Sequence, residues 1–392
     1  MNEVVIVEAV RSPTGRRNGA LSSLHALDLL GQVQRSLFER SGVDPAQVGQ
    51  VIGGCVNQVG MQTFNVTRGA WLAAGLPIEV AATTVDSQCG SSQQAAGLAY
   101  AMIAAGALES AVACGVEVMS RVPMGSAIPS EPDLGTPYSQ SYRDHFEPTT
   151  QFEGAERIAD KYGITRADCD EFGKLSQDRA GIAWAQDRFA SQIVAIDVPE
   201  VDASGYATGS ATTVSRDGGM RETTLEGLAS LKPVGGPNGV HTAGSTSQIA
   251  DGASAILMMS AQRARQLGLQ PLATVVDTCL VGVDPVLMLE GPIPATQKIL
   301  ADNSMRLEEM DVVEINEAFA SVVLAWQRTL DADLKNVNPN GGAIALGHPL
   351  GATGTLLITK AVHELARTDG TYGLVTMCCG GGLGTGTLLR RG

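Results

Sequence analysis

Residues 340–354 read NGGAIALGHPLGATG, and this glycine-rich stretch restricts the fold more than any other part of the sequence. It holds five glycines and one group that titrates near neutral pH, His348, with no Asp, Glu, Lys or Arg. Glycines this dense indicate unusual backbone dihedral angles or close approach of a ligand. An isolated imidazole in such a turn indicates proton transfer. The alternative is a glycine-rich turn around a hydrogen-bonded core histidine.

The elements expected on either side of this turn recur in the first half of the chain, around Cys89. The matched segments are Val4–Val10 with Ala273–Asp277, Val48–Val56 with Met310–Ile315, Ala82–Asp86 with the residues around Val337, Gly90–Ala107 with Gly354–Leu365, and Ala111–Gly115, within the strand expected at Leu108–Val116, with Leu374–Cys378. A helix is also expected at Thr296–Asn303. Alternating strands and helices predict a layered α/β fold, and the repeat predicts two halves of similar topology. Each half then carries its reactive residue at a strand-to-helix turn, where open α/β sheets bind ligands.

A polar region that is richer in Pro, Tyr and charge separates the two halves. It contains an amphipathic helix at 149–162 and a capping-box-like helix start at Thr165–Asp168. This periodicity favours an inserted subdomain that grips a ligand over a flexible linker. We therefore expect an N-terminal half at 1–119, an insert at 120–250, a return to the N-terminal half at 251–270 and a C-terminal half at 271–392.

The overall composition narrows the class of protein. The 392 residues are 44% hydrophobic and 17% charged, which is typical of a globular enzyme. A net charge of −14 argues against nucleic-acid binding, which needs basic patches. We expect the N-terminal residues not to act as a signal peptide, and we expect no membrane-spanning helix, because no apolar stretch of the sequence is long enough. Seven cysteines without CxxC spacing argue against disulfides and metal sites, so we expect a reducing, cytoplasmic setting.

Cys89 lies in VDSQCGSSQQA, where a strand runs into a helix of small residues. A thiol reacts as the thiolate, and the start of a helix favours that anion. A buried structural role is the commoner fate of a cysteine and is the alternative here. Since His348 occupies the matching turn of the other half, a Cys–His pair that activates the thiol is the chemical interpretation.

A second thiol follows the last expected strand, where Cys378 and Cys379 precede three glycines. The glycine N–H groups, Gly380 among them, could face an oxyanion. Packing is the favoured interpretation for Cys379, and helix capping is the alternative for Asn316 in NEAFA. The remaining cysteines, at 55, 114, 169 and 279, lie in apolar or helical contexts and are interpreted as structural. Two thiols and one histidine suit the making or breaking of a C–C bond beside a thioester carbonyl.

Four motifs together resemble those of the thiolase family over essentially the whole chain. They are VDSQCGSSQQA at 85–95, NEAFA at 316–320, GGAIALGHPLGATG at 341–354 and CCGGG at 378–382. The resemblance implies that Cys89 carries the acyl group, that His348 activates it and holds a thioester oxygen, and that Asn316 positions a water at the same oxygen. It implies that Cys378 is the acid/base at carbon, and that the N–H groups of Cys89 and Gly380 form a second oxyanion hole.

The family's co-substrate, coenzyme A, is implied by a further motif. HTAGSTSQIADGASAI at 241–256 resembles the segment that lies along pantetheine, with Ser247 and Gly244 as candidate binding residues. Gln151 in the insert is a third candidate. No tightly bound cofactor, no metal and no nucleic acid are expected, and a homodimer or homotetramer is typical of the family.

The sequence also departs from the family pattern. Asp86-Ser87 stands where Asn-Arg is frequent, and Gln151-Phe152 lies where acetoacetyl-CoA thiolases have a His-Met pair. The second difference favours bulkier substrates, and the surrounding motifs look most like bacterial thiolases of steroid catabolism. We therefore expect thiolytic cleavage of a 3-oxoacyl-CoA to acetyl-CoA, or propionyl-CoA, and a shortened acyl-CoA. The alternatives are a biosynthetic acetoacetyl-CoA thiolase, a ketoacyl-type condensing synthase, and a non-catalytic lipid carrier with the same fold.

Overall fold

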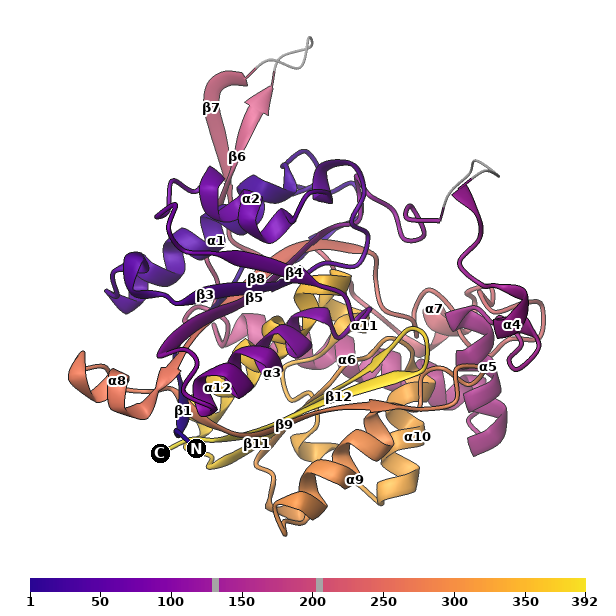
Figure 1. Ribbon diagram of the computed structural model, residues 1–392. Helices are drawn as coiled ribbons and strands as arrows, with labels where there is room; N and C mark the ends of the chain where they lie inside the picture. The colour runs from indigo at the N-terminus through magenta and orange to yellow at the C-terminus, as the bar shows by residue number, and fades with distance from the viewer. Residues whose placement is uncertain (129–133, 202–206) are drawn as a thin grey trace.

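One continuous sheet and the helices around it organise the chain (Figure 1). The computed structural model describes residues 1–128, 134–201 and 207–392. Within them the strand order is β10-β11-β12-β9-β1-β8-β5-β3-β4, and the short β2 pairs with β8. The strands are β1 (Val4–Arg11), β2 (Gly15–Arg16), β3 (Gln50–Gly54), β4 (Ala82–Val85), β5 (Ser110–Val118), β8 (Ala250–Ser260), β9 (Ala273–Gly282), β10 (Val312–Ile315), β11 (Tyr372–Cys379) and β12 (Leu383–Arg390).

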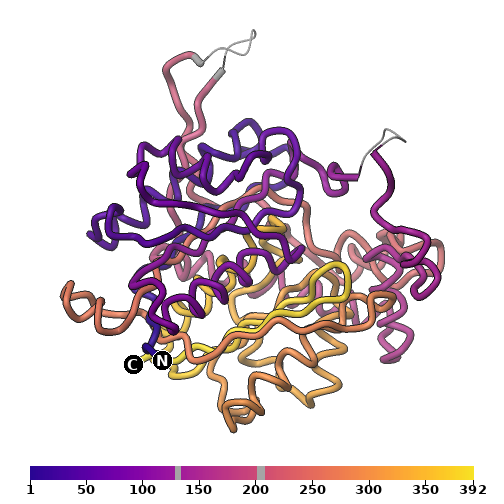
Figure 2. The backbone as a smooth tube through the Cα atoms, in the orientation of Figure 1, coloured from indigo at the N-terminus to yellow at the C-terminus, as the bar shows by residue number. Residues whose placement is uncertain are grey.

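The two halves of this sheet have the same topology, which confirms the expected duplication. In the N-terminal half, β3 pairs parallel with β4 and β5, while β8 pairs antiparallel with β5 and β1. In the C-terminal half, β10 pairs parallel with β11 and with a bridge at Val337, while β12 pairs antiparallel with β11 and β9. A short antiparallel pairing of Val4–Ile6 with Ala273–Val275 joins the halves. Figure 2 shows that both chain ends lie together at this seam, where Arg390 pairs with Glu3.

Three helical layers complete an α-β-α-β-α arrangement. The helices are α1 (Ala26–Ser41), α2 (Val66–Ala73), α3 (Ser91–Ala104), α4 (Gln140–Arg143), α5 (Gln151–Tyr162), α6 (Arg166–Ala185), α7 (Leu225–Ala229), α8 (Ala261–Gln266), α9 (Pro292–Asp302), α10 (Ala320–Leu330), α11 (Ala343–Leu346) and α12 (Thr353–Thr368). Helices α1 and α2 cover one outer face, and α9 and α10 cover the other. Helices α3 and α12 pack against each other between the two half-sheets.

The central position of α3 explains its composition. Because it is enclosed on both sides, its buried residues are small, with Ala95, Ala96 and Ala99 fully or nearly fully covered. A helix that is apolar all round is a buried helix. No helix in the described ranges is both long enough and apolar enough to cross a membrane.

The structure moves one bound of two expected elements by four or more residues, at the end of β9 and at the start of α9. The strand expected to end at Asp277 continues to Gly282, because β12 pairs with it along its whole length. The helix expected from Thr296 begins at Pro292, where a proline in the first turn loses no hydrogen bond. Neither bound follows from the local spacing of apolar residues, because one depends on pairing with β12 and the other on a proline in the first turn.

The insert divides into two parts. Helices α4 to α7 lie beside the C-terminal half, where α5 packs on α10 (Figure 1). The strands β6 (Ile196–Val201) and β7 (Ala207–Val214) instead form a hairpin whose base packs into the core of the N-terminal half through Val194 and Ile196. The residue boundaries of the domains remain our prediction.

Candidate active site

A sharp turn presents Cys89 between β4 and α3. Gln88 has a left-handed backbone with φ of 52°, which is uncommon for a residue with a side chain. The turn is held by Asp86 Oδ1, which accepts from the Gln88 N–H at 2.7 Å, and by Ser91 Oγ, which accepts from the Ser87 N–H at 3.0 Å. Gly90 then caps the helix. This geometry places the Cys89 side chain at the helix start, only 8% exposed.

Burial controls the charge of Cys89. It raises the pKa of the thiol to about 11, although the N–H groups of Gly380 and of Cys89 itself act in the opposite direction. The resting group is therefore a thiol at neutral pH. The N–H groups act in the direction that we expected of the helix start, but in the resting protein the loss of hydration outweighs them.

The end of β11 brings a second thiol and a backbone donor to the same point. Burial raises the pKa of Cys378, and a charge on Cys89 would raise it further, so the two sulfurs lie within electrostatic reach. The Gly380 N–H faces the Cys89 sulfur. The Cys379 sulfur packs beneath Gly90, where an added Cβ would lie 2.6 Å from it. Cys379 therefore fills space under the Cys89 turn.

The His348 turn lies between α11 and α12, and its hydrogen bonds select one tautomer. Thr353 Oγ1 donates to the Pro349 carbonyl at 3.0 Å and lies 2.6 Å from His348 Nδ1. Nδ1 must then carry the proton, which leaves Nε2 as an acceptor. Burial lowers the pKa of His348 to about 4, so the ring is neutral. His348 Nε2 is therefore available as a base.

Asn316 stands beside that base. Its Nδ2 lies 3.4 Å from His348 Nε2, and its Oδ1 is buried without a hydrogen-bond partner in the described chain. The helix-cap alternative for Asn316 is wrong, because α10 begins at Ala320 with Phe319 as its cap residue. A buried amide oxygen without a partner is the group that would hold an ordered water.

The candidate residues thus form two adjoining groups. Cys89, Cys378 and Gly380 make one, and His348 with Asn316 makes the other. In the residues that the structure describes, no hydrogen bond joins the Cys89 sulfur to the imidazole. The groups are linked through β11, where the Asn316 N–H donates to the Thr376 carbonyl at 3.1 Å.

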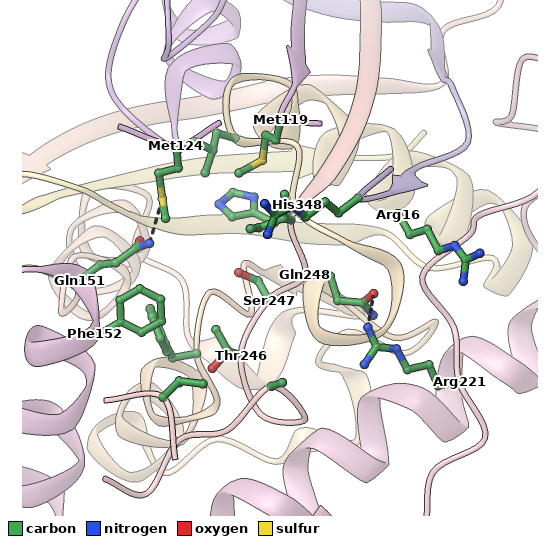
Figure 3. A pocket seen from close by; sticks show the side chains of 16 residues that line it. Arg16, Met119, Met124, Gln151, Phe152, Arg221, Thr246, Ser247, Gln248 and His348 are labelled. Carbon is green, nitrogen blue, oxygen red and sulfur yellow. Dashed lines mark hydrogen bonds between the residues drawn. The ribbon is translucent and has the colours of Figure 1, made fainter. Parts of the chain in front are cut away.

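A cavity of about 440 Å³ opens onto His348 (Figure 3). Its lining residues are Arg16, Arg17, Met119, Met124, Gln151, Phe152, Arg221, Val234, Ala243, Thr246, Ser247, Gln248, Ile249, Phe319, His348 and Leu350. Ser247 and Gln151, both predicted to bind CoA, are among them. Gly244 instead lines an adjoining cavity of about 390 Å³ that shares Arg221, Ala243 and Gln248 with the first.

Sequence reasoning missed the basic side chains of this cavity. In Figure 3, Arg16 and Arg221 lie on one side of His348, while Met124, Gln151 and Phe152 lie on the other. Arg16 and Arg17 form a basic pair just after the first strand of an acidic chain, a pattern that could have identified them. Arg221 could not be placed, because it belongs to a long insert whose path depends on tertiary packing.

Two protein-family models match this chain, one for each half. The family described as Thiolase, N-terminal domain matches residues 4–262, and Thiolase, C-terminal domain matches residues 269–391. The chain belongs to the thiolase family. This confirms the resemblance read from the four motifs, and as a thiolase the chain is an acyltransferase. No group of three or more His, Cys, Asp and Glu side chains that could hold a metal occurs in the described part of this thiolase.

Several thiolases are similar to this one over their whole length. The steroid 3-ketoacyl-CoA thiolase FadA6 of Mycobacterium tuberculosis is 42% identical, covering 100% of this chain and 95% of that protein. A beta-ketoadipyl-CoA thiolase of Acinetobacter baylyi is 40% identical, with 100% of both covered. The crystal structure of the Bacillus anthracis acetyl-CoA acetyltransferase superimposes with a TM-score of 0.91 at 36% identity, covering 100% of this chain and 99% of that one.

Proposed function

We propose that this thiolase cleaves 3-oxoacyl-CoA thioesters with CoA, giving acetyl-CoA or propionyl-CoA and a shortened acyl-CoA. The observation that supports this most strongly is that a second thiol, Cys378, lies within electrostatic reach of Cys89, whose own sulfur faces the Gly380 N–H. One thiol can hold an acyl group while the other moves a proton at carbon. A condensing synthase of the ketoacyl type would place a second histidine where Cys378 lies.

The first half-reaction forms the acyl-enzyme. His348 Nε2 takes the proton of the Cys89 thiol as the sulfur bonds to the 3-keto carbon. The resulting oxyanion is held by the N–H groups of Cys89 and Gly380. The bond between C2 and C3 then breaks and its electron pair moves to C2. Cys378 gives its proton to C2, so acetyl-CoA leaves and the shortened acyl group remains on Cys89 as a thioester.

The second half-reaction returns every group to its starting state. The Cys378 thiolate takes the proton of an incoming CoA thiol, and the CoA sulfur attacks the Cys89 thioester. The Cys89 sulfur leaves and regains its proton from His348. We propose that the enolate oxygen of the first step accepts from the His348 imidazolium and from a water held by Asn316 Oδ1. No oxidant, reductant or metal is needed to balance these steps.

The arginines of the cavity indicate the orientation in which CoA binds. CoA carries phosphate groups at one end and its thiol at the other, and Arg16, Arg17 and Arg221 are suited to bind the phosphates. Pantetheine would then pass Ser247 toward His348. Thr246 adds a buried hydroxyl without a partner in the described residues, which suits an amide of this arm.

The opposite side of the cavity favours an apolar acyl group. Met119, Met124, Phe152 and Phe319 line it, and the Gln151 amide donates to Met124 Sδ at 3.0 Å. The described lining residues on this side include no Lys or Arg to pair with a terminal carboxylate, as a 3-oxoadipyl group would require. We therefore propose bulky lipid or steroid-derived 3-oxoacyl groups, as the name of the M. tuberculosis relative suggests, rather than a dicarboxylic chain.

A thiolysis screen tests this proposal. Purified protein is assayed with acetoacetyl-CoA, long linear, steroid-side-chain and 3-oxoadipyl-CoA substrates. We expect kcat/KM for the bulky apolar substrates to exceed that for the other two by about tenfold or more, because buried methylenes contribute roughly 1–3 kcal/mol each to such discrimination. A preference for acetoacetyl-CoA would instead support a biosynthetic thiolase, and no turnover of any substrate would support a lipid carrier.

Two variants test the acyl side and the CoA side of the cavity independently in the same thiolysis screen. Gln151→Trp should fill the acyl side and reduce kcat/KM for bulky substrates while sparing acetoacetyl-CoA. Arg221→Ala should raise the KM for CoA equally with every acyl group, because it removes a phosphate contact. Equal effects of Gln151→Trp on all acyl groups would show that Gln151 contacts CoA instead.

A homodimer or homotetramer is proposed from the free edge of β4. This strand ends the sheet and pairs on one side only, and such an edge is a template for a second strand. Phe64, beside it, is 99% exposed, and its neighbour Asn65 hydrogen-bonds the Ala82 carbonyl. Sedimentation velocity should give a multiple of the 40.6 kDa chain mass, and Phe64→Asp should shift it toward the monomer. A wild-type monomer would exclude this assembly.

The compartment is proposed from the thiols. All seven cysteines are free, and those of the active site must stay reduced to work. We propose the cytoplasm, where thiols persist. Alkylation in intact cells followed by mass spectrometry should find Cys89 and Cys378 unoxidised, whereas recovery from an oxidising compartment would contradict this.

A further inference from the structure

A buried carboxylate near the active site has no part in the reaction described above. Glu117, on β5, is completely buried and makes no ion pair in the described chain. Its partners are all donors: the Val56, Asn57 and Gly351 N–H groups, each at 3.0 Å, the Gln62 side-chain amide at 3.0 Å, the Asn57 side-chain amide at 3.4 Å and, more weakly, the Cys55 thiol at 4.0 Å. Six donors and no acceptor match an ionised carboxylate, because a protonated one would need an acceptor for its own proton.

One of those donors belongs to the catalytic histidine turn. Gly351 follows His348 by three residues, and Glu117 Oε2 accepts its N–H. The other donors belong to residues 55–62, which follow β3. Glu117 therefore ties the histidine turn of the C-terminal half to the N-terminal half, which carries Cys89.

The backbone around Glu117 brings the Cys89 and His348 turns into direct contact. Gly54 and Gly115 are paired neighbours on β3 and β5. A Cβ on Gly54 would lie 2.3 Å from the Ser92 nitrogen in the first turn of α3, and one on Gly115 would lie 2.3 Å from the Gly351 carbonyl. The two turns thus rest on the same pair of glycines, without intervening side chains that could take up a shift.

We propose that Glu117 is a positioning residue, which fixes the distance between His348 and Cys89 by holding the Gly351 N–H against this glycine pair. This inference rests on the proposed function for its kinetic consequence and on the hydrogen bonds alone for its geometry. No hydrogen bond joins Glu117 to Cys89, His348 or Cys378 in the described chain. Its charge also acts on the nucleophile: burial is the largest cause of the raised pKa of Cys89, and Glu117 and Asp86 each raise it further.

The Glu117→Gln variant tests the proposal. The amide oxygen should stay at the Oε1 position, where four donors meet. The NH₂ group then faces the Val56 and Gly351 N–H groups, which releases the histidine turn. We expect kcat to fall by about 30-fold or more with KM for the thioester unchanged, because a displacement of about 1 Å can cost about 100-fold. The pH midpoint of Cys89 alkylation by iodoacetamide should move to lower pH, since a nearby negative charge is lost.

Glu117→Asp distinguishes the effect of side-chain length from the effect of the negative charge. It is also the milder variant if Glu117→Gln folds poorly. It keeps the charge, so the alkylation midpoint should stay in place. It is one methylene too short to reach Gly351 and the 55–62 segment together, so kcat should still fall. Asp251→Asn is the matched control: Asp251 is a fully buried carboxylate on the neighbouring strand, bonded to Ser120, and its loss should lower Tm without changing kcat or the midpoint.

The outcomes distinguish this inference from the proposed function. If the wild-type protein shows no thiolysis, the proposed function is overturned. The pH midpoints of Cys89 alkylation would still measure the effect of Glu117 on Cys89. Normal kcat in both Glu117 variants, corrected for folded enzyme by active-site titration, would overturn the positioning role. The positioning role would also be overturned if Asp251→Asn lost as much kcat as the Glu117 variants at an equal loss of Tm.

Discussion

The Cys378→Ala variant is expected to lose C–C cleavage by about 10³- to 10⁴-fold while Cys89 still accepts an acyl group. Cleavage needs a proton delivered to C2 as the enolate leaves, and Cys378 is the thiol placed beside Cys89 for that transfer. Acyl exchange between a simple acyl-CoA and the enzyme breaks no C–C bond, so it does not need the proton at carbon. The variant therefore separates the two chemical tasks that the proposed mechanism assigns to the two thiols.

Two assays measure this separation. Thiolysis is followed by loss of the 3-oxoacyl-CoA, and acyl transfer by the mass added to Cys89 after incubation with acyl-CoA. Cys379→Ala is the matched control, because it removes the adjacent buried sulfur, which packs beneath Gly90. It should reduce stability by roughly 1 kcal/mol and leave cleavage nearly intact. Normal cleavage by Cys378→Ala, or loss of cleavage in Cys379→Ala instead, would reassign the acid/base role.

The sequence could predict the thiols and the histidine because their positions depend on local structure. Cys89 occupies a strand-to-helix turn, which has a short-range pattern of β-branched residues followed by glycine and small helical residues. The same prediction for His348 is wrong, because the short helix α11 precedes its turn, but the dense glycines that marked the turn are also a local signal. The repeat added independent support, since the same order of elements occurs twice. Even the tautomer of His348 depends on Thr353, which lies inside the glycine-rich motif and could have been considered.

The remaining features depend on contacts between distant segments. The charge of Cys89 depends on burial by β11 and the layers around it, which a helix-start argument does not include. The length of β9 depends on β12, more than a hundred residues later. Glu117 stands in an ordinary strand sequence, and only the fold shows that all its partners are donors. Local patterns therefore identified the reacting groups, whereas their electrostatics and support required the structure.

The largest loss is expected from Cys89→Ala, about a millionfold in kcat, as for other enzymes that lose their covalent nucleophile. Both half-reactions pass through the Cys89 thioester, so cleavage and acyl exchange should disappear together, in contrast to Cys378→Ala. Cys279→Ala, which removes the most accessible of the other thiols, should change neither. Residual acyl exchange in Cys89→Ala would place the acyl group on a different residue.

The pH dependence of acylation then decides how Cys89 becomes nucleophilic. With the pKa of His348 lowered to about 4 and that of Cys89 raised to about 11, the pair is neutral imidazole and thiol throughout the physiological range. Activity should fall only as pH drops toward the pKa of His348, because protonation removes the base, and thiolate should accumulate only as pH approaches that of Cys89. Rapid-quench acylation should therefore be flat from about pH 6 to about pH 9. If the acylation rate instead changes with pH near neutrality, Cys89 and His348 form a thiolate–imidazolium pair before substrate binds.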